Sequence, residues 1–325
     1  MRDSLIVIQD GNAFDILDLC NNITWSGRIG TPTRSLKVTL LDDERGRYPR
    51  SCVNIEKGTQ CIYSRENKEL FRGIFLRQEQ GSGRMMTLIA YDNGIYLSNN
   101  KDSFLYENKT ASFIFEDVCK RFNIPYGRID NTEYIIDELP KSRTTGFDVI
   151  ADALASTYEA TSRRFSVVCN GEKMELISRE ENFLQWVIST DANVMDYDYS
   201  VDMEKIKTRI NLIDSDDKVV VSKSDPELEK LIGMFQEVAT ADKDMSEGKL
   251  NELAANMLKE QGRAKKSLSV NALGIDEIIA GTGVFVRIPH LDIVRTFYVE
   301  GDNHSYKDGY HTMKLDLLEK EEFLG

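Results

Sequence analysis

The three histidines of the chain are its clearest candidates for metal chemistry. His290, His304 and His311 all lie near the C-terminal end, among several carboxylates. Zinc-binding histidines lie about two residues apart on one face of a strand and about three or four apart on a helix. His304 and His311 are seven apart, on either side of a predicted turn at 307–309, so they can meet only as cross-strand neighbours. The spacing therefore predicts structural histidines and no metal ligand.

A second candidate is a run of alternating oxygen-bearing side chains that resembles the start of a calcium loop, namely Asp196, Asp198, Ser200 and Asp202. Such a loop needs glycine at its sixth position and a glutamate at its twelfth. Those positions hold Val201 and Lys207. Because the run alternates with Tyr197 and Tyr199, it has the period of a strand with one solvated face. We predict a surface strand.

Glycine and serine motifs predict no active site. Gly281-Thr282-Gly283 and Gly81-Ser82-Gly83 each precede a predicted strand, whereas a phosphate-binding loop leads into a helix. No G-x-S-x-G motif occurs. With 54 acidic residues, chance alone supplies many pairs of carboxylates. We therefore assign no catalytic, cofactor-binding or metal-binding residue, and we expect no cofactor.

Cysteine usage and composition indicate an ordinary soluble protein. The five cysteines are dispersed and form no C-x-x-C pair, which favours buried free thiols; they are Cys20, Cys52, Cys61, Cys119 and Cys169. The 325 residues carry a formal net charge of −13, and an acidic chain lacks the basic surplus that grips phosphates. We therefore expect no sequence-specific nucleic-acid binding. No apolar stretch is long enough for a membrane span or a signal peptide, so we expect no membrane contact and folding in the bacterial cytoplasm.

Hydrophobic periodicity divides the chain into three predicted domains. Residues 1–105 show short strands separated by turns, typical of a small antiparallel barrel or sandwich; the strands are predicted at 23–27, 35–40, 60–64, 70–78 and 85–91. Residues 106–186 are predicted to form an α+β insert. Thr110 and Thr145 are candidate N-caps of its two helices, and Asn170-Gly171 marks a hairpin. The second helix is expected to bury Phe147, Ile150, Leu154 and Tyr158.

Residues 187–325 are predicted to form a second β-barrel-like domain with inserted helices. The strand around 197–203 changes parity at Ile206, which predicts a bulge or bend near Lys205. Asp225-Pro226 and Ser246 are predicted to begin two helices. Strands follow at 267–272, 284–288, 296–301 and 312–318. The predicted fold is mainly β, with two small antiparallel barrels separated by an α+β insert.

This order of domains resembles the baseplate hub proteins of contractile phage tails. Within them, the chain is similar to the hub family of PBSX-type prophages and phage-tail-like bacteriocins. The matching stretches are Thr24-Trp25-Ser26-Gly27, Arg34-Ser35-Leu36, Leu70-Phe71-Arg72-Gly73-Ile74, Gly233, Gln236, Phe297-Tyr298-Val299, His304 and Tyr310-His311-Thr312-Met313-Lys314-Leu315. Ile232 departs from the pattern, which has an aromatic residue before Gly233.

The resemblance implies a non-enzymatic structural hub. Its expected partners are two further copies in a homotrimer, the hexameric tail tube protein, the trimeric central spike and other baseplate proteins. After assembly the protein would belong to a phage-like tail particle. Some hubs carry a fused hydrolase, and the chain ends too soon after its last predicted strand, at 321–325, to hold one. The alternative is a carbohydrate-processing or metal-dependent hydrolase built on β-domains, which would need a concave site with paired acids or a bound ion.

Overall fold

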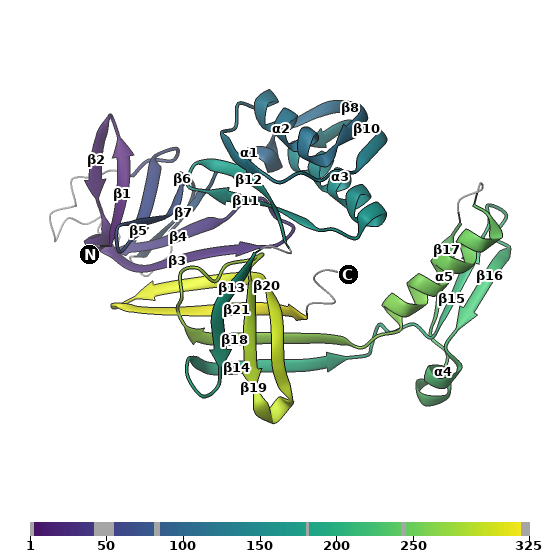
Figure 1. Ribbon diagram of the computed structural model, residues 1–325. Helices are drawn as coiled ribbons and strands as arrows, with labels where there is room; N and C mark the ends of the chain where they lie inside the picture. Colours follow the sequence, from purple (N-terminus) through teal and green to yellow (C-terminus); the bar gives the residue numbers. More distant parts are fainter. Residues whose placement is uncertain (1–2, 42–54, 81–84, 180–181, 242–244, 320–325) are drawn as a thin grey trace. The chain divides into compact units, whose positions relative to one another are not determined.

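The computed structural model describes residues 3–41, 55–80, 85–179, 182–241 and 245–319. These residues are built mainly from strands, as predicted, in one thirteen-stranded sheet and three smaller sheets (Figure 1). The chain forms two compact units, which are Met1–Tyr197 with Ser269–Gly325 and, separately, Asp198–Leu268. Among the described residues, no helix is long and apolar enough to cross a membrane.

The N-terminal β region of the larger unit is an antiparallel sheet. Its strands are β1 (Ser4–Gln9), β2 (Asn12–Asp15), β3 (Cys20–Arg28), β4 (Ser35–Leu41), β5 (Gln60–Arg65), β6 (Lys68–Gln80) and β7 (Met85–Tyr91). They lie in the order β3-β4-β7-β6-β5-β1-β2. Alternate side chains, such as Leu5, Val7 and Leu36, point into one core. The five strands predicted here are confirmed, whereas the turn predicted at 81–83 falls outside the described residues.

The α+β region follows. Its elements are α1 (Gly94–Asn99), β8 (Lys101–Thr110), α2 (Ala111–Arg121), β9 (Tyr126–Ile129), β10 (Ile135–Thr145), α3 (Gly146–Thr161), β11 (Phe165–Asn170) and β12 (Lys173–Ser178). Both predicted caps are confirmed, because Thr110 Oγ1 accepts a bond from Phe113 N at 3.2 Å and Thr145 Oγ1 accepts one from Asp148 N at 3.0 Å. Periodicity did not reveal the antiparallel β8–β10 ribbon, in which mainly polar residues face solvent.

The predicted buried face of α3 was wrong in part. Ile150 is fully buried in the α+β core, together with Val149 and Ala153. Phe147 and Leu154 are only partly buried. Both pack against this core, and together with Tyr158 they border a cavity described below. The predicted face is therefore fully buried at Ile150 and only partly buried at Phe147, Leu154 and Tyr158.

The C-terminal β region completes the larger unit. Its strands are β13 (Phe183–Ser189), β14 (Val194–Asp202), β18 (Lys265–Leu273), β19 (Gly283–Ile288), β20 (Ile293–Lys307) and β21 (Tyr310–Glu319). They pair in the order β14-β18-β21-β20-β19-β13. Among the described strands no pair joins β13 to β14, so this sheet is not closed into a barrel. The hairpin predicted at 307–309 is confirmed, with Asp308 and Gly309 at positive φ.

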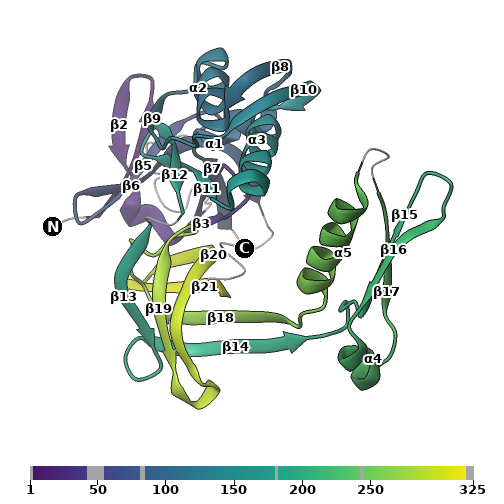
Figure 2. The same ribbon diagram turned by 45° about the vertical axis from the view of Figure 1, so that its right-hand side comes forward.

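The smaller unit, Asp198–Leu268, has a core of its own. It contains β15 (Arg209–Ile213), β16 (Val219–Ser224), α4 (Pro226–Ile232), β17 (Gln236–Thr240) and α5 (Glu247–Gln261). Figure 2 shows α5 along one face of the β16-β15-β17 sheet, where it covers Ile210 and Leu212. Both predicted helix starts are confirmed, since Asp225 and Ser246 accept N-cap hydrogen bonds.

The bulge predicted near Lys205 is a strand boundary instead. β14 ends at Asp202, and β15 begins at Arg209 in a different sheet. The change of parity at Ile206 therefore marks the passage from one core to another, because each strand turns its apolar side chains toward its own core.

Candidate functional site

The two β regions meet at one strand pair, and this junction contains the histidines singled out in the sequence. The second half of β20 pairs with β3, so that His304 lies opposite Trp25. The first half of β20 pairs with β19, while β21 follows β20 along most of its length. β20 is thus shared by both β regions. Two sheets that were expected as separate barrels are joined by a continuous hydrogen-bonded ladder.

An ion pair lies beneath this junction. Asp302, His304 and Tyr306 are spaced two apart on β20, so all three point to the same side of the sheet. Arg34 donates from Nη1 to Asp302 Oδ1 at 2.9 Å and from Nη2 to Oδ2 at 2.5 Å. The Arg34 side chain is 11% exposed and that of Asp302 is 0% exposed. Removing either partner would leave an uncompensated charge in the interior.

The surroundings fix the position of the Arg34 guanidinium. It lies 4.2 Å from the Trp25 ring centroid, a favourable contact between a cation and an aromatic face. A Cβ at Gly27 would lie 2.3 Å from Arg34 Nη1, so the glycine leaves room for the guanidinium. Asp302 also accepts a bond from the backbone N–H of Ala280 at 2.6 Å. The pair therefore holds the loop at 280 against β4 and β20.

His304 and His311 are brought together as cross-strand neighbours, as the spacing predicted. His304 Nε2 donates to the Ile278 carbonyl at 2.9 Å, so His304 Nδ1 accepts from His311 Nε2 at 3.0 Å. His311 Nδ1 then accepts from Arg65 Nη1 at 2.9 Å. All four ring nitrogens are engaged, and no lone pair remains for a metal ion. Within the described ranges no group of three or more ligating side chains could hold one.

Burial keeps both imidazoles neutral near pH 7. It lowers the pKa of His304, and it lowers the pKa of His311 to about 4 against the opposing effect of Asp276. A neutral imidazole offers one donor and one acceptor, which is what the chain of hydrogen bonds through the two rings requires. The protonation state and the hydrogen bonds thus agree.

Asp276 ends this chain of polar groups. Its carboxylate accepts two bonds from Arg65 Nη1, at 3.0 and 2.9 Å, and one from the Tyr306 hydroxyl at 2.9 Å. The Tyr306 ring stacks on His311 at 4.3 Å between centroids. Burial and the Asp276 charge raise the pKa of Tyr306. Each group is satisfied by a neighbour, so the network connects strands and supplies no free acid, base or nucleophile.

The remaining sequence candidates lie elsewhere. His290 is exposed in the turn after β19, and its ring lies 5.4 Å from that of Tyr197 between centroids, with the two planes tilted by 50°. Asp196, Asp198, Ser200 and Asp202 are exposed along β14, as expected for a surface strand. Gly281 and Thr282 directly precede β19, whose first residue is Gly283, so the segment is a turn that leads into a strand.

The cysteines are free thiols at the four described positions, Cys20, Cys61, Cys119 and Cys169. Cys52 lies outside the described residues. Burial raises the pKa of Cys20, Cys61 and Cys119 to about 12. Because the thiolate is the reactive form, these thiols are poor nucleophiles near neutral pH.

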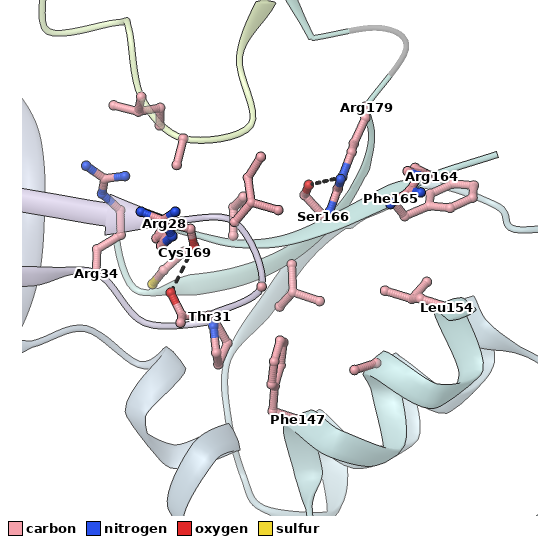
Figure 3. Close-up of a pocket in the computed structure, with 18 of the residues that line it drawn as sticks. Arg28, Thr31, Arg34, Phe147, Leu154, Arg164, Phe165, Ser166, Cys169 and Arg179 are labelled. Atoms are coloured by element: carbon pink, nitrogen blue, oxygen red, sulfur yellow. Dashed lines mark hydrogen bonds between the residues drawn. The ribbon is translucent and has the colours of Figure 1, made fainter. Parts of the chain in front are cut away.

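A cavity of about 280 Å³ lies beside the ion pair, between the β3–β4 turn, α3, β11 and the loop at 279–280 (Figure 3). One wall is apolar and includes Phe147, Leu154 and Phe165. The charged residues of its lining are all arginines, namely Arg28, Arg34, Arg164 and Arg179. Burial, together with the charge of Arg164, lowers the pKa of Arg179 to about 10, so it is still a cation at neutral pH. Sequence reasoning singled out none of these four side chains as a site.

Comparison with known proteins identifies the family. A family model described as YQBQ-like matches residues 23–318, and the chain belongs to this family. The chain is 28% identical over 320 residues to phage-like element PBSX protein XkdQ of Bacillus subtilis (strain 168), covering 97% of each protein. The resemblance to PBSX-type phage tail proteins is therefore confirmed.

Solved structures share the fold over nearly the whole chain. The 43 kDa tail protein of prophage MuSo2 from Shewanella oneidensis superposes with a TM-score of 0.74 at 10% identity, covering 99% of both chains. The c3393 protein of E. coli, a component of the type VI secretion system that is structurally similar to the T4 bacteriophage tail proteins gp27 and gp5, gives a TM-score of 0.53 at 9% identity. That match covers 98% of this chain and 74% of the other. These likenesses show that the chain shares its fold with a phage tail protein and with a type VI secretion component.

Proposed function

We propose that this protein is the hub of a contractile phage-like tail baseplate, where it joins the hexameric tail tube to the trimeric central spike. The observation that carries this proposal is the β3–β20 pairing, which makes two β regions parts of one sheet. Ladder hydrogen bonds and the Arg34–Asp302 pair hold the two regions at a fixed spacing. A connector that transmits force between tube and spike needs this rigidity.

The symmetry of the proposed assembly follows from two β regions in each chain. A six-fold tube meets a three-fold spike at one level of the tail. A homotrimer with cyclic symmetry would present six β regions to the tube while keeping three-fold symmetry toward the spike. The c3393 likeness supports a place in a tail-like assembly, because c3393 belongs to a secretion system and is itself similar to two T4 tail proteins.

Under this proposal the protein is not an enzyme and contacts other baseplate proteins. It is assembled in the cytoplasm and then becomes part of a tail particle. One of the similar solved structures is a phage tail protein, and the described histidines, cysteines and Asp276 are engaged or buried. No described feature favours the hydrolase alternative. We also propose the domain division 1–105, 106–186 and 187–325; separate cores in the N-terminal and α+β regions support two distinct parts there, and Leu97 and Phe104 belong to the α+β core.

Deletion of the gene from the phage-like element tests this role. Electron microscopy of the induced particles should show no tail in which a tube is joined to a spike. Expression of the wild-type chain from a plasmid should restore complete tails. Spike-bearing tails of normal form in the deletion strain would refute the hub assignment.

A further inference from the structure

The loop at 274–282, which joins β18 to β19, carries Asp276 to the place where the two β regions meet. The Asp276 carboxylate accepts hydrogen bonds from side chains of both regions. Tyr306 of β20 belongs to the C-terminal β region, and Arg65 of β5 belongs to the N-terminal one. Arg65 therefore fastens this loop to the N-terminal β region.

His311 shares the same guanidinium group. Its Nδ1 lies 2.9 Å from Arg65 Nη1 and 3.5 Å from Asp276 Oδ1. In the neutral imidazole Nδ1 is an acceptor, so it faces the Arg65 donor favourably and the Asp276 carboxylate unfavourably. Arg65 Nη1 has two hydrogens, and they are shared between His311 Nδ1 and both oxygens of Asp276. This arrangement requires a neutral His311.

A proton on His311 Nδ1 would reverse both relationships. It would place two donors and two positive charges 2.9 Å apart at Arg65, and it would turn the contact with Asp276 into a hydrogen bond between opposite charges. Arg65 has a second carboxylate within reach, because its Nε lies 3.8 Å from Asp3 Oδ2. Every charged group would therefore keep a partner of opposite sign.

The other groups around the His311 ring are engaged in bonds that this exchange leaves intact. Among the described residues, the further titratable or charged groups here are His304, Tyr306, Tyr63 and the Arg34–Asp302 pair. His311 Nε2 can donate to His304 in either protonation state. Burial lowers the pKa of His311 to about 4, against the opposing effect of Asp276, so the ring is protonated only in acid.

We infer that protonated His311 replaces Arg65 as the partner of Asp276, and that this exchange releases the loop at 274–282 from β5. At neutral pH, Arg65 and Asp276 connect the two β regions. In acid, Asp276 pairs with His311 inside the C-terminal region, while Arg65 pairs with Asp3 inside the N-terminal one. The β3–β20 ladder is untouched, so one connection opens while the main junction stays closed. The switch does not depend on the proposed hub role.

Hydrogen exchange of the full chain tests the switch, with amide protection corrected for the intrinsic rate at each pH. Ring signals of the three histidines in NMR spectra give the pH at which His311 is half protonated, expected near 4. At that pH the protection of residues 274–282 should be lower than at pH 7 by about fivefold or more, because half of the molecules have lost a hydrogen bond between charged groups. Residues 20–28 of β3 should keep their protection.

Three variants separate the steps of the exchange. His311→Gln cannot take up a proton but can still accept from Arg65, so the loop should lose less than about twofold in protection. Asp3→Asn can keep the bond from Glu66 N–H, which is 3.0 Å long, but it removes the second partner of Arg65. It should therefore retain more protection in acid than the wild type. Glu277→Gln is the matched control, since it removes an exposed charge from the same loop, and it should behave as the wild type does.

Several outcomes overturn the inference. These are full protection of the loop while NMR shows a protonated His311, a His311 that stays neutral until the chain unfolds, an equal loss at residues 20–28, or a loss in His311→Gln as large as in the wild type. Wild-type behaviour of Asp3→Asn would reject the exchange of partners. If His311→Gln misfolds, Arg65→Met replaces it. Its loop should be poorly protected already at pH 7, and a further loss of wild-type size in acid would contradict the switch.

Discussion

Arg34 and Asp302 stand 268 positions apart in the chain and form a bidentate ion pair under the Trp25 ring. The pair joins the start of β4 to the middle of β20, at the point where the two β regions share a ladder. Because the pair is buried, its contribution to stability is best measured by removing one of its two charges. A well-packed apolar replacement of both partners is a different experiment, because it leaves no charge unpaired.

Asp302→Asn should destabilise the fold by about 3–5 kcal/mol, because the Arg34 charge would remain buried without its partner. Denaturant unfolding of the full chain measures the change. Glu79→Gln breaks the exposed Arg77–Glu79 pair and should alter stability by less than about 0.5 kcal/mol. The double variant Arg34→Met/Asp302→Leu should recover much of the loss. Equal effects of Asp302→Asn and Glu79→Gln would contradict a buried, structurally important pair.

The histidine pair predicts a loss of stability in mild acid. Burial holds the folded pKa of His311 at about 4, below its ordinary value of about 6.5, and lowers that of His304. The unfolded chain therefore binds protons first as the pH falls. The stabilisation that comes from keeping these histidines neutral is fully present above about pH 6.5 and is lost progressively toward pH 4.

Replacement of His311 isolates its share of this effect. His311→Gln should flatten the dependence of unfolding free energy on pH between 6.5 and 4, by roughly 3 kcal/mol over the range. Urea titrations at several pH values give the slopes. A His311→Gln slope equal to the wild-type slope would show that this imidazole does not resist protonation.

Two glycines of the smaller unit should respond to alanine in opposite directions. Gly233 ends α4 at φ 91° and ψ −177°, a conformation almost restricted to glycine, so Gly233→Ala should cost about 1–3 kcal/mol. Gly248 lies in the first turn of α5 with nothing within 4 Å of its missing Cβ. Gly248→Ala should stabilise by up to about 1 kcal/mol. Hydrogen exchange of residues 198–268 in the full chain measures both changes, and the same sign for both would contradict this account.

Removal of metal should have no effect on stability. All ring nitrogens of His304 and His311 are committed to hydrogen bonds, so a metal ion would have to displace Arg65 or the Ile278 carbonyl. Melting curves with and without a chelator should superimpose, and elemental analysis should find no stoichiometric metal. A bound metal whose removal lowers the melting temperature by many degrees would reject the structural assignment of these histidines.

Local features were predictable from the sequence because their causes lie within a few residues. The N-caps at Thr110 and Thr145 and the hairpin at Asn170-Gly171 depend on neighbouring backbone groups, and all three are confirmed. The β8–β10 ribbon was not predicted, because residues such as Asp102 and Glu107 face solvent and the strand shows little alternation of apolar and polar residues.

The polar network could be predicted only in part, because its partners are distant in sequence. The meeting of His304 with His311 followed from a turn between them. No local pattern connects Arg34 with Asp302 or Arg65 with Asp276. The one available signal was the spacing of Asp302, His304 and Tyr306, which places a carboxylate on the buried side of a strand. Phe147, Leu154 and Tyr158 were predicted to be as buried as Ile150, because residues three, four or seven positions apart lie on one side of a helix.

The central claim is that this chain is a trimeric hub, and its copy number in intact tails tests this most directly. Quantitative mass spectrometry of purified tails, calibrated on the tube and spike proteins, gives that number. The hub proposal predicts three copies per tail, one for each chain of the spike. Six copies, or a single copy, would contradict it.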